Sequence, residues 1–189
     1  ILYITANALS SQLIYPSSNF YLNLAKFLNE NFYSFDILLA ENFYKIDNFK
    51  KAKKIYRNLS QKGEAFKWHS SKQIARILVR EEDKEKAVKF ISNAYKDLNV
   101  KEVYEIFDFA EFLKNNEKFK KSIIYYTDIL NLINQNHPLY SEATDGRGVA
   151  YERIGEWDKA EKDLLESLNA DPNQAYVINY LAYSWIEQG

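Results

Sequence analysis

The chain has 189 residues, 47% of them hydrophobic and 27% charged, which is the composition of a folded protein of one or two domains. Its 25 Lys and Arg nearly balance its 26 Asp and Glu, and the net charge of −1 gives no support for a nucleic-acid or anionic-membrane surface. The absence of Cys excludes disulfides, thiolate metal sites and a cysteine nucleophile, while few Gly (5) and Pro (3) favour helices over a turn-rich β architecture.

Small side chains recur in two series along the chain, one for each helix of a repeating pair. The first series, in the first helix of each pair, is Ala6, Ala40, Ala75, Ala110, Gly148 and Ala182. The second series, near the start of the second helix, is Ser18, Ala52, Ala87, Ser122 and Ala160, with steps of 34, 35, 35 and 38 residues. A bulky residue follows the second series by four positions, at Leu22, Tyr56, Ile91, Tyr126 and Leu164. Because helices that cross closely need small residues at the crossing, we expect Ala75 to meet Ala87, and Gly148 to meet Ala160.

This register divides the chain into six units, which we expect to form a single domain of about 11 helices over residues 1–189. The units are an opening repeat (1–32), four full repeats (33–66, 68–101, 103–136 and 141–174) and one last helix (175–189). The chain begins with Ile1 and contains no Met, so we expect it to be part of a longer protein. The last helix lacks a partner helix, so we expect either further chain or self-association to cover its apolar face.

The clearest repeat lies in the last third of the chain. Its small, aromatic, turn and terminating residues are Gly148, Tyr151, Gly155, Trp157, Ala160 and Pro172. This pattern resembles the 34-residue tetratricopeptide repeat, except that Arg147 stands where the pattern has Leu. The resemblance implies an all-α fold, a right-handed α-solenoid of antiparallel helix pairs. The block from residue 137 to 189 is also similar to a bacterial, mostly alphaproteobacterial, family of repeat proteins of undefined role.

The sequence predicts no catalytic, cofactor-binding or metal site. His69 and His137 lie in different repeats without ligand spacing, and we interpret both as surface histidines. The segment from Asp145 to Gly148 contains two glycines but follows no predicted strand, so it is not a phosphate loop. The lysine-rich run 50–54 begins a second helix, and we expect it to be a solvated face rather than an anchor for an acidic partner. We therefore do not expect an enzyme.

The resemblance also implies a concave groove lined by fixed positions of the first helices. The implied groove residues are Glu41, Tyr44, His69, Lys72, Arg76, Arg80, Tyr104, Phe107, Glu111, Asn115, Asp145, Arg153, Tyr176, Asn179 and Tyr183. Chaperone-binding members of the family use a Lys and an Asn where this chain has Ile37 and Glu41, which argues against the same carboxylate clamp.

Three cations stand out within this set. Lys72, Arg76 and Arg80 are four residues apart and share one face of a helix, where they could bind an acidic peptide or a C-terminal carboxylate. The alternative is that Glu41 on one side, and Asp108 and Glu111 on the other, pair with them. Such surface pairs contribute about 0–1 kcal/mol each.

The leading hypothesis is a scaffold that binds a protein or peptide through the concave groove, with no cofactor and no membrane span. The first alternative is an RNA-binding helical-repeat protein, against which the near-neutral charge and the acidic groove residues argue. The second is a non-catalytic repeat region of a larger enzyme. The composition is that of a soluble protein, and the sequence does not distinguish a cytoplasmic from a periplasmic location.

Overall fold

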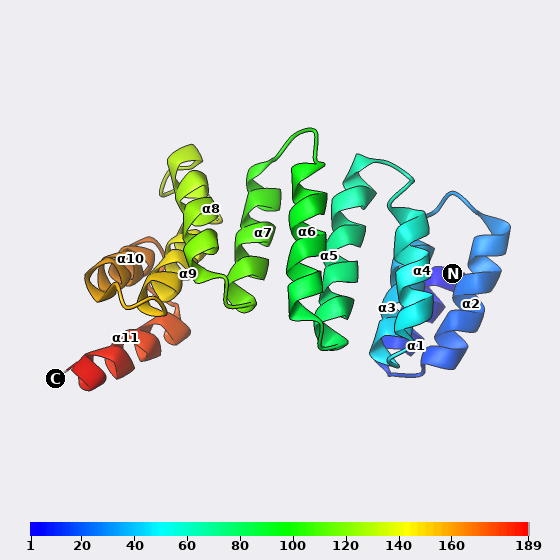
Figure 1. The fold of residues 1–189 in the computed structure, drawn as a ribbon. Helices are drawn as coiled ribbons and strands as arrows, with labels where there is room; N and C mark the ends of the chain where they lie inside the picture. Colours follow the sequence, from blue (N-terminus) through cyan, green and yellow to red (C-terminus); the bar gives the residue numbers. More distant parts are fainter. Residues whose placement is uncertain (189) are drawn as a thin grey trace. The chain divides into compact units, whose positions relative to one another are not determined.

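Residues 1–188 are described by a computed structural model, and within that range the chain forms eleven helices and no strand (Figure 1). The first six helices are α1 (Leu2–Ser11), α2 (Tyr15–Leu28), α3 (Ser34–Lys45), α4 (Phe49–Leu59), α5 (Glu64–Arg80) and α6 (Lys84–Lys96). The others are α7 (Val103–Asn115), α8 (Phe119–Leu132), α9 (Tyr140–Glu152), α10 (Trp157–Ala170) and α11 (Ala175–Gln188). The prediction of an all-α fold with about 11 helices is confirmed.

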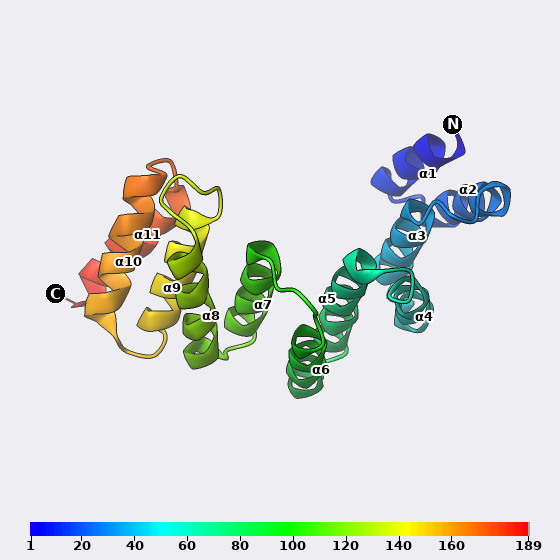
Figure 2. The ribbon, with the colours of Figure 1, turned by 90° about the horizontal axis from the view of Figure 1, so that it is seen from above.

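The helices pack into two compact units, Ile1–Leu98 (unit 1) and Asn99–Gly189 (unit 2). Within each unit, consecutive helices form hairpins, and we name the first helix of a hairpin the A helix and the second the B helix. In unit 1 the A helices α1, α3 and α5 lie on one side and the B helices α2, α4 and α6 on the other (Figure 2). The organisation of residues 1–189 as one domain stays a prediction.

The small residues predicted at helix crossings are buried except Ala182 of α11, which is exposed because no following B helix among the described residues crosses it. Ala75 and Ala87 have no exposed surface, and they lie on α5 and α6, which pack together. At Gly148 on α9, a Cβ atom would lie 3.2 Å from the carbonyl oxygen of Ala160 on α10 and 3.0 Å from the Cγ of Leu164. The backbones therefore meet where the repeat register predicts, and the position tolerates little more than a hydrogen.

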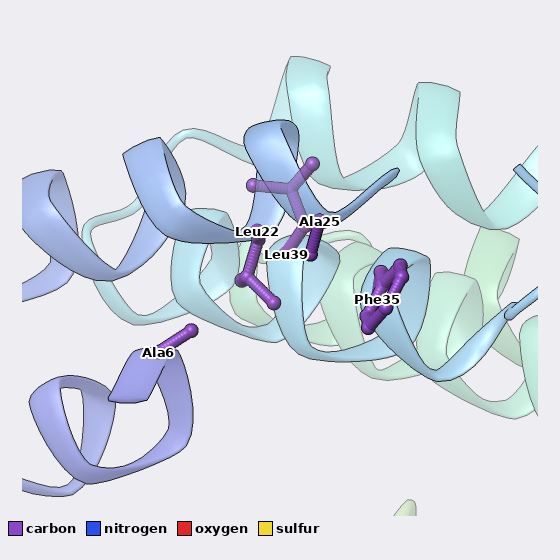
Figure 3. Close-up of a cluster of buried hydrophobic side chains, with 5 residues drawn as sticks. All are labelled: Ala6, Leu22, Ala25, Phe35 and Leu39. Atoms are coloured by element: carbon purple, nitrogen blue, oxygen red, sulfur yellow. The ribbon is translucent and has the colours of Figure 1, made fainter. Parts of the chain in front are cut away.

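Larger apolar residues fill the space beyond these crossings. One cluster in unit 1 joins Ala6 of α1, Leu22 and Ala25 of α2, and Phe35 and Leu39 of α3 (Figure 3). A cluster in unit 2 is built in the same way, because buried residues of the hairpin α9–α10 pack against the next A helix, α11. Its members are Val149, Leu164, Val177 and Leu181. Within each unit, a hairpin thus buries its apolar face against the A helix that follows it.

One turn geometry recurs between the A and B helices of every hairpin. The residue before the cap of the B helix has a left-handed backbone, with φ between 56° and 81°, at Leu13, Asp47, Glu82, Glu117 and Gly155. The next backbone N–H donates to the carbonyl oxygen five residues earlier, as in Asn48 to Phe43 (2.8 Å) and Glu156 to Tyr151 (3.0 Å). These are the hydrogen bonds of a Schellman motif. Their spacing repeats the steps of the small residues.

Two details differ from the sequence interpretation or explain a departure from the pattern. Helix α5 begins at Glu64, before the expected boundary at residue 68, because Gly63 with φ of 141° ends the preceding turn there. Arg147, which replaces the Leu of the repeat pattern, makes two hydrogen bonds of 2.7 and 2.9 Å to the buried carboxylate of Asp163. A charged pair between α9 and α10 thus takes the place of an apolar contact.

Candidate functional site

In unit 1, a buried tyrosine carries its hydroxyl from a B helix to the exposed side of an A helix. Tyr56 of α4 is 1% exposed, and its hydroxyl donates to Oε2 of Glu41 on α3 over 3.4 Å. Burial raises the pKa of the Tyr56 phenol, and the nearby Glu41 carboxylate raises it further, so the hydroxyl keeps its proton. The ring of His69 packs 6.1 Å from the Tyr56 ring, centroid to centroid.

The same glutamate binds a cation from the next repeat. Nη2 of Arg76 on α5 lies 2.9 Å from Oε1 of Glu41, and its guanidinium is 3.9 Å from the ring centroid of Tyr44. Arg80 lies 3.4 Å from Asp47 in an exposed pair. The prediction that Glu41 pairs with the basic line is confirmed. Two of the three cations proposed to bind an acidic peptide thus have carboxylate partners within unit 1.

Unit 2 contains the same tyrosine and glutamate at the same spacing. Tyr126 of α8 is fully buried, and its hydroxyl donates to Oε1 of Glu111 on α7. Burial raises the pKa of Tyr126, and the Glu111 carboxylate adds to that effect. Here Glu111 pairs with Lys114 of its own helix at 2.6 Å. The ring of Phe107 lies edge-on to Tyr126, at 6.3 Å between centroids.

The Tyr126 ring packs against a glycine of α9. A Cβ atom at Gly146 of α9 would lie 2.6 Å from Cζ of Tyr126 and 2.7 Å from its hydroxyl oxygen, distances that real Cβ atoms do not adopt. The sequence pattern around Gly146 indicates only that the segment is not a phosphate loop. The structure assigns it a packing role, which is to admit a tyrosine ring against the α9 backbone.

Asp145, beside this glycine, is half-buried, and its Oδ1 atom is buried without a hydrogen-bond partner among the described residues. Burial raises the pKa of Asp145 to about 6; the Glu111 and Glu142 carboxylates raise it too, whereas Lys114 lowers it. The A-helix side of unit 2 therefore concentrates negative charge around the Tyr126–Glu111 pair.

Two hollows lie on the A-helix side of unit 2. The larger, of about 560 Å³, is lined by Lys114, Asn115, Glu117, Phe119, Val149, Arg153 and Tyr176. The smaller, of about 370 Å³, is lined by Glu152, Arg153, Tyr176, Asn179, Tyr180, Tyr183 and Ser184. Arg153 and Tyr176 line both hollows, so these two side chains join them into one surface.

The structure brings several of the predicted groove residues together in two places, one in each unit. Unit 1 brings Glu41, Tyr44 and Arg76 into contact, and unit 2 brings Asn115, Arg153 and Tyr176 around one hollow. Tyr104 is exposed, and its ring lies 6.1 Å from that of His137, away from the lining of both hollows. The assignment of these residues to a binding site stays a prediction.

Sequence reasoning missed four residues of these surfaces. Tyr56 and Tyr126 were counted only as bulky core residues, and Lys114 and Tyr180 were not considered. The hydroxyl of Tyr180 donates to Oε2 of Glu152 over 2.6 Å, and the neighbouring Tyr176 ring is 5.8 Å away. One signal was available for the tyrosines, because each follows its glutamate by 15 residues.

The described part of the chain holds no cluster of three His, Cys, Asp or Glu side chains that could bind a metal ion. Within residues 1–188, no helix combines the length and apolar character required to cross a bilayer.

Solved structures of helical-repeat proteins are similar to the chain. YrrB, described as a TPR protein with an unusual peptide-binding site, is 17% identical over 96% of this chain and 90% of its own, with a TM-score of 0.61. TTC0263, a TPR protein of Thermus thermophilus, is 13% identical over 98% of this chain and 97% of its own, with a TM-score of 0.67. The C-terminal part of a TPR protein from Cytophaga hutchinsonii is 17% identical over 93% and 67%, with a TM-score of 0.63.

No protein-family model matches the chain, and no curated protein matches it significantly. The similarity to the solved structures covers nearly the whole chain at low identity. It shows the fold, which is that of tandem tetratricopeptide-type helical hairpins.

Proposed function

We propose that the chain is an interaction scaffold that holds a peptide segment of another protein along the A-helix side of its repeats. The observation that carries this proposal is the joined hollow surface of unit 2. Tyr176, which is 59% exposed, and Arg153 stand at its centre, with Tyr183, 72% exposed, at one end. Exposed Tyr and Arg beside a hollow are the side chains that most often dominate protein interfaces.

The mixed chemistry of the surface also suits a peptide. Lys114, Arg153, Asn115 and Glu152 offer donors and acceptors of both signs around the aromatic rings. A peptide backbone carries both kinds of group and needs both to be paired when water is displaced. The peptide-binding site named for YrrB, a protein of the same fold, is consistent with this use.

Selection from a phage-displayed library of random peptides tests the proposal without knowledge of the natural partner. The affinity of a selected peptide is measured by fluorescence anisotropy for the wild type and for Tyr176→Ala and Arg153→Ala. We expect each variant to weaken binding by about tenfold or more. The matched control is Lys162→Ala on α10, an exposed residue outside both hollows.

Peptides that bind both hollow variants as tightly as the wild type would overturn the proposal for unit 2. The basic line of unit 1 is tested in the same assay with Lys72→Gln and Arg80→Gln. If a selected peptide is acidic and these variants leave its affinity unchanged, the basic line is not its binding site.

A single-stranded RNA included as a second ligand tests the alternative function, which requires binding that Tyr176→Ala weakens.

Self-association through α11 is a separate proposal. Ile178 and Ile186 of this helix are 47% and 78% exposed. Sedimentation velocity over a range of protein concentrations should show an oligomer that the double variant Ile178→Ser, Ile186→Ser dissociates. A monomer at every concentration would contradict it.

A further inference from the structure

An apolar row runs along the outer side of α2, away from the A helices. Phe20, Leu24 and Phe27 are 65%, 39% and 81% exposed, and their spacing of four and three residues places them on one helix face. The opposite face of α2 carries Ser18 and Leu22, which are fully buried. The core of unit 1 is therefore complete without the apolar row.

The outer faces of the next two B helices are mainly basic, although exposed Glu85 of α6 stands at the repeat position of Lys50. At the positions that correspond to the apolar row and beside them, α4 and α6 carry six exposed cations, Lys50, Lys51, Lys54, Arg57, Lys89 and Lys96. Among the described residues, none of the six side chains forms a salt bridge. Helix α4 contains no Asp or Glu at all. This side of unit 1 thus combines an apolar helix with a cationic surface.

The charge of unit 1 follows from the same distribution. It contains sixteen Lys and Arg against ten Asp and Glu, a formal charge of +6, whereas unit 2 contains nine against sixteen, a formal charge of −7. The net charge of −1 for the chain conceals this separation, and the sequence interpretation that it gives no support for an anionic-membrane surface therefore does not extend to unit 1.

We infer that the outer side of unit 1 is a docking surface for an anionic lipid membrane. The apolar row would insert at the level of the lipid headgroups, while the lysines of α4 and α6 would lie among the phosphates. Apolar side chains beside Lys and Arg are the combination that interfacial binding requires. Helices α2, α4 and α6 lie on one side of the unit (Figure 2), and their exposed residues include both kinds. This inference is independent of the peptide surface.

Two observations favour lipid over other anionic partners. Five of the six cations are Lys, whose mobile point charge suits a diffuse array of phosphates, whereas defined carboxylate recognition favours the planar fork of Arg. A nucleic acid would engage the cations but would leave Leu24 and the two phenylalanines without a role. A fluid bilayer also needs no shape complementarity to accept exposed side chains such as Phe27.

Flotation of the whole chain with phosphatidylcholine vesicles, with and without phosphatidylglycerol, tests the inference. We expect binding only to the anionic vesicles, with weaker binding at higher salt. The variant Lys54→Gln, Arg57→Gln should lower the partition coefficient by about tenfold or more, because each cation near an anionic surface contributes about 1 kcal/mol. The variant Phe20→Ser, Phe27→Ser should lose binding to a similar extent.

Matched controls come from the same repeat positions in unit 2. Ile124 of α8 and Lys162 of α10 are exposed like Phe20 and Lys54, and the changes Ile124→Ser and Lys162→Gln should leave vesicle binding unaltered. The charge variant touches no buried residue, so its result stands even if the phenylalanine variant folds poorly. Equal binding to both kinds of vesicle, no binding to either, or equal losses in the unit 2 controls would overturn the inference. So would salt-sensitive binding to duplex DNA in place of vesicles.

Discussion

The two units use the same buried tyrosine and half-buried glutamate, but the following repeat brings a different charge to the pair in each unit. In unit 1, Glu41 accepts from Tyr56 and binds Arg76 of the following repeat. In unit 2, Glu111 accepts from Tyr126, and the following repeat supplies Asp145, a second carboxyl, in place of a cation. The glutamate is therefore paired across repeats in unit 1, by Arg76, and within its own helix in unit 2, by Lys114, where the following repeat adds a second carboxyl instead of a cation.

This difference gives the A-helix sides of the two units different electrostatics. The Glu41–Arg76 pair and the stacking of Arg76 on Tyr44 satisfy the A-helix side of unit 1 internally. Unit 2 keeps the half-buried carboxyl of Asp145, whose Oδ1 atom has no hydrogen-bond partner among the described residues, and this is a less stable arrangement for an isolated protein.

The largest effect should come from removing the unsatisfied carboxyl. The pKa of Asp145 is raised from 3.8 to about 6, so the folded state holds this proton more tightly than the unfolded chain. The stability of unit 2 should therefore fall as the pH rises from about 4 to about 6 and stay lower above that range. Asp145→Asn should increase the free energy of unfolding by about 2 kcal/mol at neutral pH and leave it unchanged near pH 4. Urea denaturation at the two pH values measures both numbers.

The exposed neighbour Glu142 supplies the control for that experiment, since Glu142→Gln should show a much smaller pH-dependent gain. Titration of Asp145 by NMR gives a second check. Lys114 lowers the pKa of Asp145, so Lys114→Gln should move its midpoint upward. A midpoint near 4 in the wild type would contradict the comparison between the units.

The next effect concerns the glycine behind Tyr126. Gly146→Ala gains about 1 kcal/mol of helix propensity but forces a methyl group against the buried ring, and we expect a net loss of about 1–2 kcal/mol. Gln73 holds the equivalent place in unit 1, and Gln73→Ala should change stability by less than about 0.5 kcal/mol. Hydrogen exchange resolved by residue should place the Gly146→Ala loss in unit 2. A loss shared equally by both units would show that the contact is not local.

A smaller effect is expected for the ion pair that distinguishes unit 1. Arg76→Gln removes the salt bridge to Glu41 and the contact with Tyr44, and should lower stability by about 1 kcal/mol. The loss should shrink at high salt because the pair is partly exposed. Thermal denaturation at low and high salt measures this, and a loss that salt does not change would assign the effect to packing on Tyr44 alone.

Effects of equal or smaller size lie in the recurrent left-handed turn, which holds a glycine once in unit 2 and never in unit 1. Glu82 holds a left-handed backbone with φ of 62°, and Glu82→Gly should raise stability by about 0.5 kcal/mol after the greater chain entropy of glycine is counted. Gly155 has φ of 81°, so Gly155→Ala should lower stability by about 1 kcal/mol. We therefore expect the denaturation midpoint to rise for Glu82→Gly and to fall for Gly155→Ala.

The repeat register was accessible from the sequence because it rests on residue size. Ala75, Ala87 and Gly148 had to be small for helices to cross, and burial confirms each of them. The start of α5 at Glu64 was not found, since a helix boundary depends on local backbone angles that the repeat period does not specify.

The candidate surfaces could be predicted only in part, because their chemistry depends on contacts between repeats. The pairing of Glu41 with the basic line followed from neighbouring helices. The roles of Gly146 and Tyr126 did not, because a glycine that admits a ring from the preceding B helix looks the same in sequence as one in a loop. The apolar row on α2 was also missed, because at helical spacing it is indistinguishable from a core stripe until exposure is known.

The recurrent left-handed turn has an evolutionary consequence. Four of its five occupants are Leu, Asp or Glu, although glycine would adopt the backbone with less strain, so the hydrogen-bond register and the packed hairpin maintain the turn whatever the side chain. Selection on individual turn residues is then weak, and lineages can exchange them freely while the architecture persists. Proteins that descend from a common ancestor could in this way lose all recognisable sequence similarity and still share the fold.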